Sequence, residues 1–140
     1  MKTFLIWVLS IFIILQFIPA EVENQKTDKN LEIKVSTEIM SIFKKSCYDC
    51  HSNEVKIPWY SKVAPVSFTV SRHVNLGRKW LNFSIWESYT QEQKDKKLKE
   101  IYRAVYRAMP LGMYTSMHKE AILTKDEINL IRDWTGKAPF

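Results

Sequence analysis

The five-residue motif Cys47-Tyr48-Asp49-Cys50-His51 constrains the fold more than any other feature of the sequence. Two thiols at this spacing match the two vinyl groups of a haem, to which they add, and the histidine that follows is placed to reach the iron. The chain holds no other cysteine, so no thiol remains for a structural disulfide. The motif predicts one covalent haem c per chain, with His51 as a metal ligand. The alternative is a chance C-x-x-C beside an unrelated histidine.

The N-terminal segment, residues 1–20, has the pattern of an export signal. Lys2 precedes an apolar run from Phe4 to Ile18 that only Ser10 and Gln16 interrupt. A run of this length suits a secretory signal and is short for a membrane span. The sequence predicts either a signal peptide cleaved after Ala20 or an uncleaved signal anchor. In both cases we expect the rest of the chain on the periplasmic side of the cytoplasmic membrane.

Export alone does not decide the fate of the two cysteines. An oxidising compartment favours disulfides, but covalent haem attachment also takes place outside the cytoplasm, and the adjacent His51 favours haem. The formal net charge is +6, of which Lys2 is the only contribution from residues 1–20. A modestly basic protein suits acidic redox partners or an anionic membrane surface, and general solubility explains the charge equally well. No nucleic-acid-binding motif is present.

Periodicity divides the remainder into a polar tether, residues 21–34, and one domain, residues 35–140. Helix signals occur in four places, and strand-like alternation in none. Ser36 caps a first helix that ends near Ser46, and Pro65 begins a second helix that Gly77 ends. Thr90 and Gln93 form a capping box at the start of a third helix, which reaches Ala108. Thr124 and Glu127 form another capping box at the start of a last helix, which Gly136 ends. The predicted fold class is all-α, a small cytochrome c-like domain. Because such a domain buries a limited core, a haem would supply much of its interior.

The second iron ligand decides between electron transfer and catalysis or sensing. Met109 is the preferred candidate, because Pro110 ends the helix there and turns the thioether away from the helical path. His118 and His73 are the alternatives, His118 being read first as a hydrogen-bonding loop residue. Arg72 and Arg78, near His73, are candidates for binding haem propionates through forked hydrogen bonds, or they form a solvated basic face.

Several further segments resemble the haem-binding domain family of exported bacterial c-type cytochromes. The resemblance extends from the haem motif to the last helix and is carried by Cys47 to Asn53, Pro58-Trp59-Tyr60, Val63 to Ser67, Arg72-His73-Val74, Gly77-Arg78, Leu81 to Ser84, Trp86, Met109-Pro110, Tyr114, His118 and Asp133-Trp134. It implies a single covalent haem beside an N-terminal membrane-targeting segment, and it leaves the reaction open.

These patterns predict an electron carrier rather than an enzyme: a monohaem cytochrome c that exchanges single electrons with redox proteins and is held at the membrane by its N-terminal segment. One alternative is a haem enzyme, such as a peroxidase, or a gas sensor, with an open sixth position and a polar histidine nearby. Another is a thiol–disulfide oxidoreductase that uses Cys47 and Cys50. That class needs a reactive thiolate at a helix N-terminus, whereas this motif follows a helix.

Overall fold

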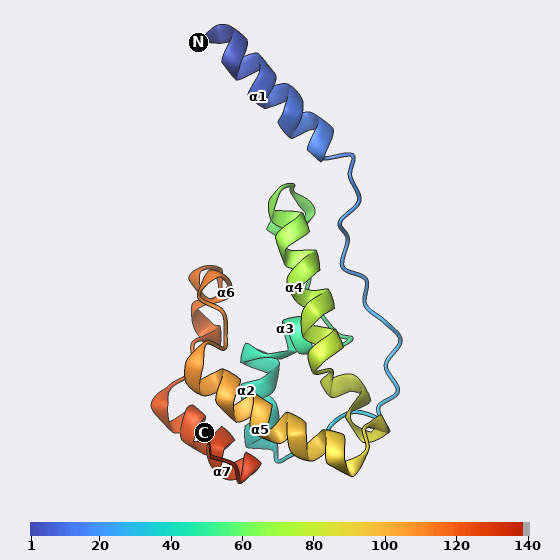
Figure 1. Cartoon of the computed structure of the whole chain (residues 1–140), viewed down its shortest axis with the longest axis vertical. Coiled ribbons are helices and arrows are strands. Elements are labelled where there is room, and N and C mark those ends of the chain that lie inside the picture. The colour runs from blue at the N-terminus through green and yellow to red at the C-terminus, as the bar shows by residue number, and fades with distance from the viewer. Residues whose placement is uncertain (139–140) are drawn as a thin grey trace.

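The computed structural model describes residues 1–138, and over that range helices are the only regular secondary structure (Figure 1). Its α-helices are α1 (Lys2–Leu15), α2 (Thr37–Ser46), α3 (Tyr48–His51), α4 (Val66–Trp80), α5 (Gln91–Arg107), α6 (Gly112–Met117) and α7 (Lys125–Thr135). Three 3₁₀ helices lie between them: η1 (Trp59–Lys62), η2 (Phe83–Ser88) and η3 (Lys119–Ala121). The all-α prediction is confirmed for these residues.

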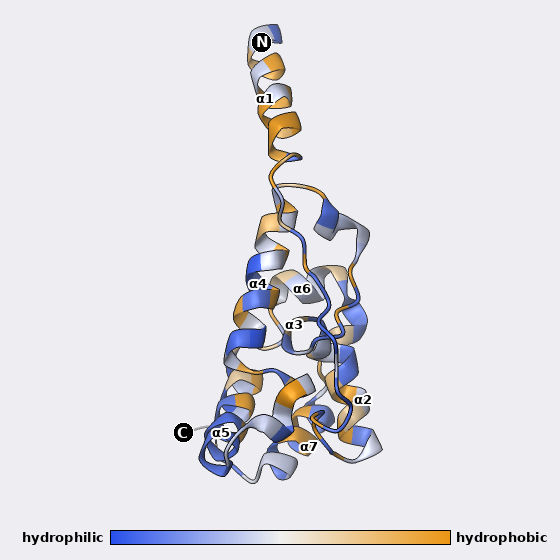
Figure 2. Ribbon diagram, turned by 90° about the vertical axis from the view of Figure 1, so that its right-hand side faces the viewer, coloured by the Kyte–Doolittle hydropathy of each residue, from blue (hydrophilic) through white to orange (hydrophobic). Residues whose placement is uncertain are grey.

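Helix α1 stands apart from the domain, beyond the N-terminal end of α4, and is the most continuously apolar part of the chain (Figure 2). None of its side chains is buried. Within residues 1–138, no helix combines the length and the apolar character needed to cross a membrane. The end of α1 is nevertheless joined to the domain, because the Gln16 side-chain amide, just past the helix, hydrogen-bonds to both the N–H and the C=O of Ala64.

Residues 21–34, predicted as a tether, lie along the domain. Val22 and Ile33 are buried, and the Ile33 N–H donates to the carbonyl of Phe83 at 2.9 Å. The Asn24 side chain pairs with both backbone groups of Val55, at 2.7 and 2.9 Å. Although this segment is mostly polar, a few apolar and amide side chains attach it to the domain. The packed unit therefore begins upstream of residue 35.

Three of the four predicted helix starts are confirmed by their caps, and α4 begins directly after Pro65, as predicted. The Ser36 hydroxyl accepts from the Ile39 N–H, and both capping boxes form, Thr90 with Gln93 and Thr124 with Glu127. Gly136 ends α7 in the left-handed conformation, with φ of 59°. Two features differ from the prediction. Helix α4 continues through Gly77 to Trp80, and a short helix, α6, follows the loop after α5.

The main core lies where α2, α5, α7 and η2 meet, and Phe43 of α2 is at its centre. The Phe43 ring stacks on Phe83 with ring centroids 4.6 Å apart and meets the edge of Trp134 at 5.2 Å. A smaller cluster of Val22, Val55 and Val74 lies between the N-terminal segment and α4. Packing on the main core fixes the end of α2, and the haem motif begins at that point.

Candidate haem site

The haem motif forms one turn of helix between the two apolar clusters. Cys47 ends α2, and its carbonyl accepts from the N–H groups of Cys50 and His51 at 3.1 and 2.9 Å. Cys47 packs against the main core, and Cys50 packs against the smaller cluster. Both thiols are free. The turn therefore presents the two sulfur atoms and the imidazole from a single short, well-packed segment.

Burial makes the two thiols poor acids. It raises the pKa of Cys47 to about 12 and, with the charge of Asp49 adding to the effect, raises that of Cys50 to about 11. A thiol–disulfide oxidoreductase needs the opposite, a thiolate stabilised at neutral pH. The environment of this C-x-x-C pair therefore argues against that class and is compatible with sulfur atoms that serve as covalent attachment points.

His51 is oriented by two backbone carbonyl groups of the segment that ends α4. Its Nδ1 lies 3.1 Å from the oxygens of both Gly77 and Leu81. Because carbonyls only accept hydrogen bonds, Nδ1 carries the proton and Nε2 carries the lone pair. Burial also lowers the pKa of His51, so the ring is neutral. Nε2 makes no hydrogen bond to the residues from 1 to 138, which leaves it available to a metal.

Gly77 lets α4 approach the haem motif closely. A Cβ atom at this position would lie 2.5 Å from the carbonyl oxygen of Cys50, and 3.2 Å and 3.3 Å from the carbonyl carbon and Cβ of the same residue. Only glycine fits at this distance. Gly77 was predicted to end its helix, and its observed role is instead a tertiary one: its missing side chain admits Cys50, and its carbonyl orients His51.

A network of buried hydrogen bonds connects the residues just after the haem motif to the start of η2. The Asn53 N–H donates to the hydroxyl of Ser84 at 2.9 Å, the Asn82 amide donates to the side-chain oxygen of Asn53 at 2.7 Å, and the Ser84 N–H donates back to Asn82 at 3.0 Å. The Ser52 hydroxyl donates to the Tyr48 carbonyl at 2.7 Å. All four side chains of this network, those of Ser52, Asn53, Asn82 and Ser84, are buried. Sequence reasoning gave these residues no role beyond family resemblance.

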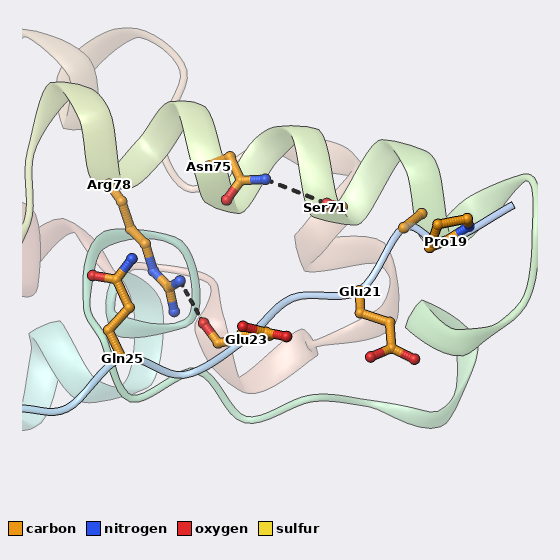
Figure 3. A pocket seen from close by; sticks show the side chains of 8 residues that line it. Pro19, Glu21, Glu23, Gln25, Ser71, Asn75 and Arg78 are labelled. Atoms are coloured by element: carbon orange, nitrogen blue, oxygen red, sulfur yellow. Dashed lines mark hydrogen bonds between the residues drawn. The ribbon is translucent and has the colours of Figure 1, made fainter.

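Arg78 is close to the motif, but its hydrogen bonds hold protein segments together. Its Nε donates to the Ser52 carbonyl at 2.7 Å, its Nη1 to the Glu23 carbonyl at 2.7 Å and its Nη2 to the Asn24 side chain at 3.3 Å. Figure 3 shows it reaching across from α4 to the N-terminal segment, at one end of an open cavity of about 480 Å³. The predicted propionate contact would compete with these bonds. Arg72, the other candidate, lies exposed on α4.

Met109 lies immediately after α5, as the sequence predicted. Its N–H donates to the Ala104 carbonyl at 2.8 Å, and its side chain is half-buried. The loop that follows leads into α6, where the Tyr114 hydroxyl donates to Asp49 Oδ2, inside the haem motif, at 2.7 Å. This bond fastens α6 to the motif. The loop that carries Met109 is therefore anchored at one end by α5 and at the other by the motif itself.

His118 has partners for both ring nitrogens. Its Nε2 is hydrogen-bonded to the Tyr60 hydroxyl at 2.6 Å, its Nδ1 lies 3.2 Å from Glu120, and its ring stacks on Tyr114 at 4.4 Å. These contacts fit the loop hydrogen-bonding role read from the sequence. Tyr60 and Tyr114 join η1, α6 and the motif, and sequence reasoning assigned neither of them a function. His73 is half-buried on α4.

Comparison with known families decides what this arrangement belongs to. The family model for the haem-binding domain matches residues 10–137, nearly the whole chain. The chain belongs to the haem-binding domain family. No curated protein and no solved structure matches it significantly.

The residues at this site fit a haem group. Two thiols flank one turn of helix, a neutral imidazole presents an unprotonated Nε2, and a glycine admits the motif against α4. By contrast, residues 1–138 contain no group of three or more His, Cys, Asp or Glu side chains able to hold a bare metal ion. The donor set suits an iron that brings its own porphyrin ligands.

Proposed function

We propose that this haem-binding domain is a monohaem c-type cytochrome that carries one electron at a time. Cys47 and Cys50 would hold the porphyrin through thioether bonds, and His51 and Met109 would bind the iron. The observation that carries the proposal is the fixed imidazole: two carbonyls hold Nδ1, and Nε2 is left for iron beside both thiols. When bound, haem supplies an iron centre that gains and loses single electrons.

The protein's part is to orient ligands and set the local polarity. Hydrogen bonds from Nδ1 to Gly77 and Leu81 fix the ring and raise the basicity of Nε2, which favours the oxidised state. A methionine ligand has the opposite effect, because it gives the haem iron a higher reduction potential than a second histidine ligand would. On the core side of the motif, the ring of Phe83 stacks on Tyr48 and meets the edge of His51, so the surroundings there are apolar.

We infer further that the domain works on the periplasmic side of the cytoplasmic membrane, with α1 holding it there. The support is the apolar run after Lys2 and the absence of any buried residue in α1. The positive net charge favours redox partners with acidic surfaces.

A second candidate function follows from the polar cluster of Tyr60, His118 and Glu120 beside α6. In a haem enzyme or gas sensor, the sixth position is open and a polar residue acts on the bound molecule. His118 would serve that purpose if the thioether of Met109 did not reach the iron. Carbon monoxide distinguishes the two functions, because it binds readily to ferrous haem with an open position and slowly to haem with two protein ligands.

The test is an absorption spectrum of the full chain produced with haem-maturation machinery. We expect a low-spin spectrum in both oxidation states, the weak far-red band of methionine-ligated ferric haem, and little change on adding carbon monoxide. A high-spin spectrum with rapid carbon monoxide binding would overturn electron carriage in favour of the enzyme or sensor. A protein without haem would overturn both.

A further inference from the structure

Exposed apolar side chains gather at the end of the domain that faces α1. They belong to residues 56–66, here called the interfacial loop, which contains η1 and leads into α4. Trp59 is the most exposed tryptophan in the chain at 75%, and Ile57, Val63 and Val66 are exposed around it. Exposed apolar side chains that gather on one surface, unlike single scattered ones, mark a site of interaction with a partner or a membrane.

The interfacial loop is attached to the end of α1. The Ala64 N–H donates to Gln16 Oε1 at 3.1 Å, and Gln16 Nε2 donates to the Ala64 carbonyl at 3.3 Å. A cavity of about 360 Å³ is lined from one side by Leu15 and Ile18 and from the other by Ile57 and Lys62. The last apolar residues of the N-terminal segment and the loop therefore lie at the same level. Figures 1 and 2 both show α1 beyond the N-terminal end of α4.

Because α1 is short, the end of α1 and the interfacial loop would lie at the membrane surface. Its 14 residues extend about 21 Å, less than the apolar thickness of a bilayer, about 30 Å. A helix this short, once embedded, draws the adjoining residues into the headgroup region instead of holding the domain at a distance.

The composition of the interfacial loop suits the headgroup region of a membrane. Between Lys56 and Val66 it has two lysines, Lys56 and Lys62, and no acidic residue, although Glu21 lines the neighbouring cavity and Glu120 interacts with the charge of Lys56. Tryptophan prefers the membrane–water interface, and lysine pairs with anionic headgroups. The loop is also preformed, since Ser61 donates to the Pro58 carbonyl at 2.6 Å and Tyr60 is held by His118. Inserting it costs little ordering of the chain.

We propose that the interfacial loop inserts Trp59 and its apolar neighbours into the headgroup region of an anionic bilayer, while Lys56 and Lys62 bind lipid phosphates. This proposal rests on the membrane attachment by α1 proposed above. It gives the domain a fixed orientation, with the N-terminal end of α4 toward the membrane. Gly77, where the haem motif packs, is 11 positions further along the helix than Val66, about 16 Å from that end. The motif then stays outside the lipid, accessible to a soluble redox partner.

The experiment places the haem-loaded full chain in phosphatidylglycerol vesicles that contain a phospholipid with a photoactivatable diazirine on its acyl chain. After illumination, mass spectrometry locates the lipid adducts. We expect adducts on α1 and on the interfacial loop, and none around Trp80, which is 66% exposed at the opposite end of α4. Trp59→Ser should reduce loop adducts about tenfold, because one partly inserted aromatic side chain contributes roughly that factor to partitioning. Trp80→Ser is the matched control and should change nothing.

Adducts on α1 without adducts on the loop would overturn this proposal and leave membrane attachment intact. Adducts on neither segment would overturn both. Equal labelling near Trp80 would show random collision and would also reject the proposal. Replacing Lys56 and Lys62 by Gln should lower loop labelling in phosphatidylglycerol vesicles and not in phosphatidylcholine vesicles, and an equal effect in both would reject the role of lipid phosphates.

Discussion

Gly77→Ala tests the packing of α4 against the haem motif. Its added Cβ would lie 2.5 Å from the Cys50 carbonyl oxygen, about 0.9 Å closer than ordinary van der Waals contact allows. The obstructing atoms are mostly backbone, so no flexible side chain can move aside, and α4 and the motif must separate. Overpacking of this kind costs roughly 1–3 kcal/mol. Alanine in a helix interior returns about 1 kcal/mol relative to glycine. We therefore expect a net destabilisation of about 1 kcal/mol.

The sign of the change is diagnostic, because helix propensity alone would make the variant more stable. Gly112→Ala is the matched control: Gly112 is also helical, and a Cβ there meets nothing within 4 Å. Urea unfolding of the haem-loaded chain, followed by circular dichroism, should show Gly77→Ala less stable than the wild type and Gly112→Ala equally or more stable. The reduction potential should rise in Gly77→Ala alone, because separation loosens the bonds from His51 Nδ1. If both variants gain stability together, the close approach is not a constraint and the reasoning fails.

Three further predictions concern the ligand loop, the network behind the motif and an ion pair. Met109→Ala should open the iron to carbon monoxide and lower the potential, while His118→Ala leaves the ligation spectrum unchanged; the reverse pattern would assign the ligand to His118. Asn82→Ala should cost about 2–3 kcal/mol in urea unfolding, because it strands buried hydrogen-bonding groups, and a loss under 0.5 kcal/mol would contradict this. Burial alone would raise the pKa of Glu127, but hydrogen bonds from Lys45 and Thr124 lower it below the usual value. That stabilisation is present at neutral pH and disappears as the pH falls through the lowered pKa. Glu127→Gln should therefore lose roughly 0.5–1 kcal/mol at pH 7 and differ less from the wild type in acid, and a constant difference across the pH range would refute the ion pair.

Local signals allowed the starts of α5 and α7 and the end of α7 to be predicted. The capping boxes at Thr90 and Thr124 and the left-handed Gly136 depend on residues a few positions apart, and all three form. The position of the haem motif at the end of α2 followed in the same way, because one apolar stripe and one N-cap define that helix.

Contacts between distant segments could not be predicted from the sequence. Tyr114 and Asp49 are 65 residues apart, and Tyr60 and His118 are 58 apart, so no local pattern reveals their bonds. Gly77 was interpreted from its usual place at helix ends, whereas the backbone of Cys50 sets the requirement for glycine there. Arg78 was considered for haem propionates because a guanidinium pairs with carboxylates, and that role stays a prediction. Its hydrogen bonds to the distant carbonyls of Ser52 and Glu23 could not be read from the sequence.

Covalent haem attachment is tested by the intact mass of the full chain, purified from cells that carry haem-maturation machinery and then denatured in acid. We expect one species, the polypeptide plus a single haem that survives denaturation. Cys47→Ala and Cys50→Ala should each weaken haem retention, and the double variant should carry no covalent haem. A wild-type mass equal to that of the polypeptide alone, with haem extracted into organic solvent, would contradict covalent attachment through Cys47 and Cys50.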